Sequence, residues 1–300
     1  MGLQQPDARH DRCFDGSEIV VHLAAASLVL ALAAGAGAAA DAKQHMAVQT
    51  GFLDRSVIVD GVAYRYQVFV PADFTQEKAW PVALFLHGSG ERGDDGLHQT
   101  AVGLPAAIRN ERTRFPMIVV MPQARNNTRW NGVMATQAMK ALDAAIAEFH
   151  GDPRRVYLTG LSLGGQGTWL LAAANPHRFA AIAPVCGFLR LKDDDDVIDP
   201  VADAALAKEF PEALAVDPSA AFAKRIGKVP VWIFHGALDD AVPVHNARRM
   251  DVAMRAQGGE VRYSEYVDAN HNAWDHAYGE PELVPWLLSH TLADSQASKP

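Results

Sequence analysis

The chain has 300 residues, of which 49% are apolar and 21% are charged. This composition is typical of a soluble globular protein and excludes a disordered or fibrous chain. The formal net charge of −8, without any basic run of Lys and Arg, argues against a nucleic-acid partner. A chain of this length can bury most of its apolar surface in one large domain, so it needs no disulfide or metal to support a core.

The N-terminal region contains an apolar run, Ile19 to Ala40, that ends in small residues before Asp41. Such a run with a small-x-small cleavage site predicts a cleaved export signal, and therefore a secreted or periplasmic protein without stable membrane association. The residues before the run are acidic rather than basic, which is unusual for a signal. The alternative is an uncleaved membrane anchor, because the run is just long enough to span a bilayer.

Two short strands follow in SVIVDGVAYRYQVFVP, where Asp60-Gly61 predicts a tight hairpin turn. Further apolar runs predict strands at 82–86, 117–121, 155–160, 180–185, 229–234 and 261–267. Helical spacing between most of these runs predicts helices at 134–149, 163–174, 244–257 and 281–290. Near-continuous apolar strands that alternate with helices predict an α/β fold with a mostly parallel central sheet and helices on both faces.

One connection is longer than such a fold requires. Residues 188–228 separate two predicted strands and include the helical-looking segment PVADAALAKEF. This segment predicts a helical insertion over one end of the sheet. The predicted organisation is an N-terminal extension with a signal over 1–40, a linker over 41–51, the main domain over 52–292 and a tail over 293–300.

The cysteines and histidines indicate neither a disulfide nor a metal site. Cys13 precedes the segment expected to be removed, which leaves Cys186 without a partner, as a buried apolar side chain rather than a reactive thiol. Four adjacent carboxylates, Asp193 to Asp196, lack ligand spacing and indicate a solvated loop rather than a cation site. The twelve histidines include no H-E-x-x-H pattern, so we expect no metal and no cofactor.

The segment RVYLTGLSLGGQG places one serine, Ser162, between an apolar strand and a helix. Its spacing fits G-x-S-x-G, in which a sharp turn exposes the hydroxyl group and small neighbours let the flanking backbones pass closely. The backbone N–H of Leu163 then opens a helix, where a developing oxyanion meets a donor and a favourable dipole. The alternative is a serine that only caps a helix in a tight turn.

A nucleophilic serine needs a histidine to take its proton and a carboxylate to orient that histidine. Asp239 follows the strand in VWIFHGALDD, with Asp240 as the alternative, and His271 stands in a polar loop after the final strand. His276 falls later, in or near the next helix, and is less well placed. We expect Ser162, Asp239 and His271 to converge at the carboxyl ends of three strands, where ligands bind to parallel sheets.

A second oxyanion donor is expected in the loop after an earlier strand, in ALFLHGSGERGDD. The N–H of Ser89 is the preferred donor and that of Gly90 is the alternative. His87 ends the buried strand, and we expect it to pack or to orient this loop rather than to act as a base.

Aromatic and amide side chains near the expected site are candidates for substrate binding. In MPQARNNTRWNG, Trp130 and Asn131 follow another strand end together with Asn126 and Asn127, and an ordinary surface loop explains them equally well. Trp274, close to the expected base, is either a wall of the pocket or a packing residue.

Together, HGSGERG, GLSLGG, HGALDDAVPV and NHNAWD resemble the α/β-hydrolase superfamily over 52–290. They are similar to the branch with the phospholipase/carboxylesterase group, the polyhydroxybutyrate-depolymerase-like esterases and the predicted serine peptidases related to prolyl oligopeptidase. The resemblance implies a nucleophile at Ser162, an acid at Asp239 and a base at His271, in the chain order of this superfamily. It also implies oxyanion donors at Ser89 and Leu163. The insertion departs from the compact members of this branch.

The expected function is that of a carboxylesterase, a serine hydrolase that cleaves a small-molecule or polymer ester through an acyl-enzyme. The same triad acting on an amide would make a secreted serine peptidase of the prolyl-oligopeptidase type, because the nucleophile does not encode the leaving group. A non-catalytic binding protein on the same scaffold is the alternative of another class, and it predicts a missing triad member.

Overall fold

The computed structural model describes residues 49–189, 200–215 and 217–293. By its internal contacts the chain separates into residues 1–45 and 46–300, and all described residues belong to the second unit. The predicted export signal, Cys13 and the run Asp193 to Asp196 lie outside the described residues, so these remain predictions. None of the described helices is both long and apolar enough to span a membrane.

An antiparallel hairpin begins the sheet, as the sequence predicts. Strands β1 (Gly51–Val59) and β2 (Val62–Val70) pair along their whole length. The two residues between them, Asp60 and Gly61, have positive φ angles of 49° and 79°, which a two-residue type I′ turn requires. Strand β2 also pairs antiparallel with β4 (Ile118–Pro122), which joins the hairpin to the rest of the sheet.

The sheet has eight strands in the order β1-β2-β4-β3-β5-β6-β7-β8, and β3 to β8 run parallel. The strands not yet introduced are β3 (Trp80–Leu86), β5 (Gly151–Leu161), β6 (Ala181–Val185), β7 (Val231–Gly236) and β8 (Val261–Tyr266). Side chains alternate between two cores: Val82 and Leu84 face one, whereas Ala83 and Phe85 face the other. The predicted mostly parallel sheet with two buried faces is confirmed.

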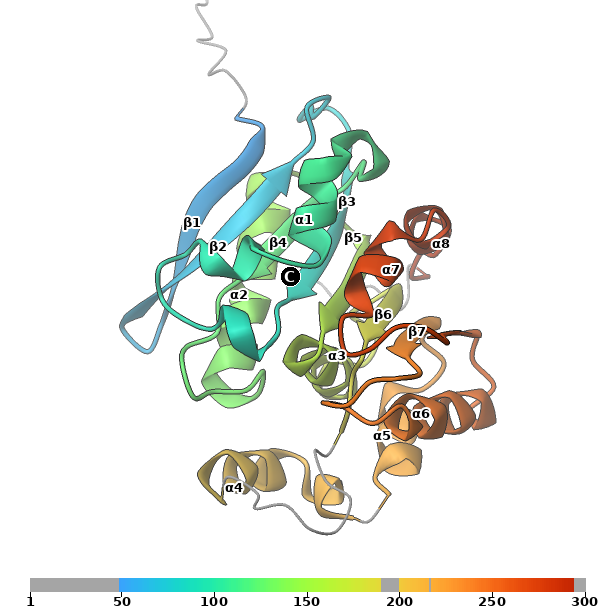
Figure 1. The fold of residues 1–300 in the computed structure, drawn as a ribbon. Helices are drawn as coiled ribbons and strands as arrows, with labels where there is room; N and C mark the ends of the chain where they lie inside the picture. Colours follow the sequence, from blue (N-terminus) through green and yellow to red (C-terminus); the bar gives the residue numbers. More distant parts are fainter. Residues whose placement is uncertain (1–48, 190–199, 216, 294–300) are drawn as a thin grey trace, which may run out of the picture. The chain divides into compact units, whose positions relative to one another are not determined.

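Helices cover both faces of this sheet (Figure 1). The first core contains side chains of α2 (Gly132–Glu148), α3 (Leu163–Ala174), α5 (Ser219–Ile226) and α6 (His245–Ala256). The second contains side chains of α1 (Leu104–Asn110), α7 (Trp274–Gly279) and α8 (Leu283–Leu288). Helix α1 is not predicted from the sequence, because its seven residues make too few turns to show a helical period.

The long connection between β6 and β7 holds helix α4 (Pro200–Glu209), the short turn η4 (Pro211–Leu214) and helix α5. Helix α5 packs against α3 and α6 in the layer of helices that covers the first core. The inserted part of the connection therefore lies before α5. Phe210 is buried and stacks on Phe222 of α5 with ring centroids 5.4 Å apart. Glu209 accepts a hydrogen bond from the backbone at the start of α2. The predicted insertion is therefore helical, but it is shorter than expected.

Candidate active site

The carboxyl ends of β5, β7 and β8 bring three predicted residues together. Nε2 of His271 lies 2.9 Å from Oγ of Ser162. Nδ1 of the same ring lies 2.8 Å from Oδ2 and 3.0 Å from Oδ1 of Asp239. Each residue follows a different strand, and because these strands are parallel, all three residues lie at the same end of the sheet. The imidazole of His271 therefore lies within hydrogen-bonding distance of both the Ser162 hydroxyl group and the Asp239 carboxylate.

Ser162 occupies a sharp turn between β5 and α3. Its backbone has φ 53° and ψ −115°, a conformation that is costly for a residue with a Cβ atom. Neighbouring glycines make the turn possible: a Cβ on Gly164 would lie 1.9 Å from the carbonyl oxygen of Leu86. A Cβ on Gly160 would lie 2.4 Å from the carbonyl oxygen of Gly164. The N–H of Ser162 donates to the carbonyl of Val185, which ties the turn to β6.

Asp239 is buried and accepts several hydrogen bonds. The N–H groups of Ala241 and Val242 donate to Oδ1 at 3.0 and 2.8 Å. Nε2 of His235 lies 3.2 Å from Oδ2 and 2.8 Å from the Val242 carbonyl, and since both are acceptors, Nε2 carries the proton of that ring. Burial alone would raise the pKa of Asp239, but the hydrogen bonds from the two histidines and Val242 hold it below its usual range. The carboxylate is therefore ionised at neutral pH.

His235 is a member of this site that the sequence does not identify. It lies in the buried strand β7, four residues before Asp239. The available signal is a polar side chain within an otherwise apolar strand. The sequence does not indicate that the turn after β7 places Asp239 against His235, because this contact depends on the backbone conformation of the turn.

His271 is positioned through its ring and its backbone. Because Nδ1 faces the ionised Asp239, it carries a proton, which leaves the lone pair of Nε2 directed at Ser162. The ring of Trp274, at the start of α7, meets the imidazole edge to face with centroids 5.4 Å apart. The thiol of Cys186 lies 3.5 Å from the backbone carbonyl of His271 and donates to it. Trp274 is partly buried against the second core and is not among the residues that line the cleft described below.

A cleft of about 470 Å³ opens beside Ser162. Loops after β3 and β4 contribute polar and cationic residues to its lining, and loops after β6 and β7 contribute apolar ones. In the sheet, β3 and β4 lie on one side of β5 and β6 and β7 on the other, so we call the two sets of lining residues the β3–β4 wall and the β6–β7 wall. The lining includes Ser89, Arg92, Asn127, Arg129, Phe188 and Val242.

The two predicted oxyanion donors, Leu163 and Ser89, both line this cleft. Leu163 is the first residue of α3, so its N–H has no partner within the helix. Ser89 begins the short turn η1 (Ser89–Glu91) after β3. The preceding residue, Gly88, passes so close to the nucleophile that a Cβ on it would lie 3.6 Å from the Cβ of Ser162. Both N–H groups therefore belong to backbone that borders the hydroxyl group.

Trp130, a candidate substrate contact on sequence grounds, is part of the core and does not line the cleft. Its side chain is fully buried, its Nε1–H donates to the backbone carbonyl of His87 at 3.1 Å, and a Cβ on Gly167 would lie 2.5 Å from it. Asn131 stands at the N-cap position of α2 and does not line the cleft either. Asn127, in the same loop, does line it. The sequence locates the correct loop, but burial of the large indole makes Trp130 part of the core.

His87 supports the loop that carries Ser89, the structural role expected from the sequence. Its ring is fully buried, and Nε2 accepts a hydrogen bond from the N–H of Ala124 at 2.9 Å. Nδ1 therefore carries the proton and donates to the carbonyl of Gly88 at 2.6 Å. Burial lowers the pKa of His87 to about 4, so the ring is neutral at pH 7.

Acidification is expected to destabilise the fold through His87. An unfolded histidine titrates near pH 6.5, so between about pH 6.5 and pH 4 the unfolded chain binds a proton that the folded chain does not. The free energy of unfolding therefore falls by up to about 3 kcal/mol as the pH drops through this window, and the full value is present above it. Chemical denaturation at several pH values measures this slope.

His87→Gln is the test variant for this pH dependence. It is expected to be less stable than the wild type at neutral pH, because it loses the buried hydrogen bonds, but to show a shallower slope between about pH 6.5 and pH 4. His150→Gln is the matched control, since His150 is exposed, and it should keep the wild-type slope. A wild-type slope in His87→Gln would contradict the assignment.

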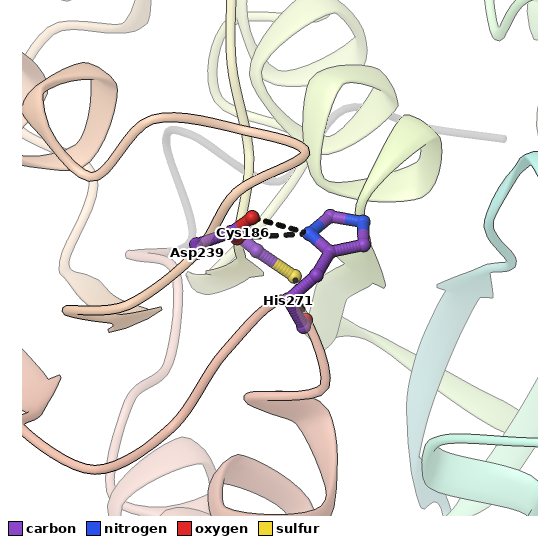
Figure 2. A group of neighbouring side chains, drawn as sticks. All are labelled: Cys186, Asp239 and His271. Atoms are coloured by element: carbon purple, nitrogen blue, oxygen red, sulfur yellow. Dashed lines mark hydrogen bonds and ion pairs between the residues drawn. The ribbon is translucent and has the colours of Figure 1, made fainter.

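Three potential metal ligands also lie at this site. Cys186, Asp239 and His271 are neighbouring side chains (Figure 2), and their ligand atoms all lie within 4.8 Å of one another. Burial raises the pKa of the Cys186 thiol, so it stays protonated and donates to the His271 backbone instead of offering a thiolate. Nδ1 of His271 is engaged with Asp239. The chemistry of these donors therefore favours hydrogen bonding over metal binding.

Comparisons with known proteins give several relatives. An uncharacterized secreted protein of Arthroderma benhamiae is 27% identical over 204 residues, which cover 64% of this chain and 21% of that protein. A protein of Methylorubrum extorquens, described as "Putative carboxymethylenebutenolidase", is 34% identical over 139 residues, which cover 45% of this chain and 41% of that protein. The chain thus spans less than half the length of either relative.

A solved structure matches the fold of this chain, and a family model matches its sequence. The crystal structure of a thermostable esterase matches with a TM-score of 0.64 at 28% identity, over 80% of this chain and 63% of that one. The fold is that of an α/β-hydrolase. The model of the prolyl oligopeptidase family matches residues 123–290, more than half of the chain, including Ser162, Asp239 and His271. The chain therefore belongs to the prolyl oligopeptidase family.

Proposed function

We propose that this protein is a carboxylesterase in which Ser162 is the nucleophile, His271 the general base and Asp239 the carboxylate that orients it. The observation that carries this proposal is the 2.9 Å approach of Nε2 of His271 to Oγ of Ser162. The esterase structure and the relative described as a carboxymethylenebutenolidase support an ester as the substrate. That substrate is a small-molecule or polymer ester, and the reaction needs no cofactor.

Acylation starts when Oγ of Ser162 attacks the carbonyl carbon of the ester and its proton moves to Nε2 of His271. The carbonyl oxygen becomes an oxyanion, which the N–H groups of Leu163 and Ser89 stabilise together with the N-terminal end of α3. The ionised Asp239 stabilises the imidazolium that forms. The tetrahedral intermediate then breaks its bond to the alcohol oxygen, which takes the proton from Nε2.

Deacylation repeats these steps with water. His271 takes a proton from the water, the hydroxide attacks the acyl carbon, and the same N–H groups stabilise the second oxyanion. Collapse of this intermediate returns the proton to Oγ of Ser162 and releases the acid. The net reaction converts one ester and one water into one acid and one alcohol.

A serine peptidase is the second candidate, because the family is named for an oligopeptidase. The same groups would attack an amide, and Nε2 of His271 would protonate the departing amine. A binding protein without catalysis finds less support. It predicts a missing or displaced triad member, whereas Ser162, His271 and Asp239 lie at hydrogen-bonding distances.

A fluorophosphonate probe and a matched substrate pair test the proposal. The probe is expected to label Ser162 in the folded wild type, because it reacts with activated serines. A 4-nitrophenyl ester and a 4-nitroanilide with the same acyl group then separate the two enzyme activities by their kcat/KM values. The rates of both compounds with hydroxide correct for their intrinsic reactivity.

We expect the corrected kcat/KM to be higher for the ester than for the anilide. A higher corrected value for the anilide would support the peptidase instead. A folded wild-type protein that neither reacts with the probe nor hydrolyses either compound would contradict both enzyme activities and support a binding protein.

The proposed location is outside the cytoplasm. The relative of Arthroderma benhamiae is described as secreted. The predicted export signal supports the same location, with an uncleaved anchor as the alternative, and it lies outside the described residues.

A further inference from the structure

We infer that the ester cleaved here carries a carboxylate near its scissile bond, and that Arg92 binds this group. The inference rests on the proposed function, because it concerns the substrate of the same cleft. Both arginines line the cleft that contains Ser162. Arg92 follows β3 and Arg129 follows β4, so two loops bring positive charge to the same side of the nucleophile.

Arg92 is held by backbone groups and not by an acid. Its Nε donates to the carbonyl of Ser89 at 2.9 Å, and its Nη1 donates to the carbonyl of Thr128 at 3.2 Å. Within the described ranges, no carboxylate lies within 4.0 Å of this guanidinium group. The neighbouring Glu91 does not neutralise it, and burial raises the pKa of that carboxyl group. A guanidinium group has five N–H donors, so Arg92 keeps donors for an anion.

Arg129 adds a second positive charge to the same wall of the cleft. It is partly buried, and its Nη1 donates to Oε1 of the buried Gln166 at 3.3 Å. The side chain is therefore supported by a fixed partner. Asn127 also lines this wall and offers an amide N–H₂ group. The wall combines two guanidinium groups with a neutral donor, a composition that suits an anionic group.

The β6–β7 wall has a different composition. Phe188 and Val242 line it, and they come from the loops after β6 and β7. Asp239 does not line the cleft, since its side chain is fully buried beside His271. A substrate that matches both walls has an apolar part on the β6 and β7 side and an anionic part on the β3 and β4 side.

A carboxylate is the anion that these groups fit. Planar guanidinium groups bind carboxylates through paired N–H donors, and such charge-assisted hydrogen bonds are among the strong ones in proteins. The cleft, at about 470 Å³, has the size of a site for a small organic molecule. Arg92 also connects the Ser89 and Thr128 loops, so a purely structural role would affect all esters equally, whereas carboxylate binding affects charged esters selectively.

Two matched ester pairs separate these roles. Mono(4-nitrophenyl) glutarate and 4-nitrophenyl valerate differ by a terminal carboxylate on the acyl side. Acetoxybenzoate and methylphenyl acetate, both para-substituted, differ by a carboxylate on the leaving-group side. The measured quantity is the ratio of kcat/KM for the charged ester to that for the neutral ester. Any disturbance of the oxyanion loop affects both esters of a pair and cancels in the ratio.

We expect Arg92→Gln to lower this ratio about 10- to 100-fold in at least one pair, the range for loss of a hydrogen bond to a charged group. Arg92→Lys keeps the charge and should keep more of the ratio. Arg112→Gln removes one positive charge from an exposed position outside the cleft, and it should keep the whole ratio. Added salt should lower the ratio of the wild type, because ions screen the attraction.

An unchanged ratio in Arg92→Gln for both pairs would overturn the inference. If the fluorophosphonate probe still labels Ser162 in that case, the proposed function stands without it. A folded wild-type protein that neither reacts with the probe nor hydrolyses any of the four esters would overturn both.

Discussion

Ser162→Ala is expected to lower kcat for ester hydrolysis about 10⁵- to 10⁶-fold. Without Oγ no acyl-enzyme forms, and His271 is left without the proton that it is placed to accept. The remaining rate enhancement comes from the oxyanion donors and from substrate binding, which do not need the hydroxyl group. The substitution removes one oxygen atom and keeps the Cβ, so the turn between β5 and α3 should persist.

Steady-state kinetics with a 4-nitrophenyl ester measures this loss, and far-UV circular dichroism with chemical denaturation confirms that the variant is folded. Ser56→Ala is the matched control, because Ser56 lies on β1 and does not line the cleft, and it should hydrolyse the ester at the wild-type rate. Wild-type hydrolysis by folded Ser162→Ala would show that another group is the nucleophile.

Asp239→Asn is expected to lower kcat/KM about 10⁴-fold. The amide of asparagine offers an N–H₂ group to Nδ1 of His271, and this favours the tautomer with the proton on Nε2. In that tautomer Nε2 has no lone pair for the proton of Ser162. The geometry of the site remains, while the direction of its hydrogen bonds is reversed.

Asp240→Asn is the control for this substitution. Asp240 is the neighbouring carboxylate and was the alternative acid on sequence grounds, but its side chain is exposed and only Asp239 lies against His271. Near-wild-type kcat/KM is expected for Asp240→Asn. Similar losses in both variants would contradict the assignment of the acid to Asp239.

The free energy of unfolding of the wild type and that of Asp239→Asn should depend differently on pH. The pKa of Asp239 is lowered in the folded protein, so its carboxylate stabilises the fold above the unfolded pKa of about 3.9. This contribution disappears as the pH falls through the folded value. Asp239→Asn should therefore be less stable than the wild type at neutral pH, and the difference should narrow in strong acid.

Much of the fold could be predicted because its determinants are local. The buried parallel strands appear as short apolar runs, and Asp60-Gly61 marks a turn that needs two positive φ angles. The glycines around Ser162 indicate the tight turn, since any side chain at Gly160 or Gly164 would collide with backbone. The approximate positions of the strand ends then place the serine, acid and base at one edge of the sheet.

The parts that could not be predicted depend on contacts between distant segments. Trp130 and Asn127 lie in one loop, but Trp130 is buried against Gly167 and His87 whereas Asn127 lines the cleft. His235 gains its role because the turn after β7 folds Asp239 back against it. The positive wall of the cleft likewise needs the strand order, which places the loops after β3 and β4 side by side.

The division of the cleft between strand ends and loops has a consequence for how such a protein diversifies. The groups proposed for bond cleavage are anchored at the ends of β5, β7 and β8, whereas Asn127 and Arg129 belong to a loop after β4. Mutations that change the length or charge of that loop can select a new substrate while the chemistry stays intact. Laboratory evolution toward other esters should therefore begin with saturation of this loop.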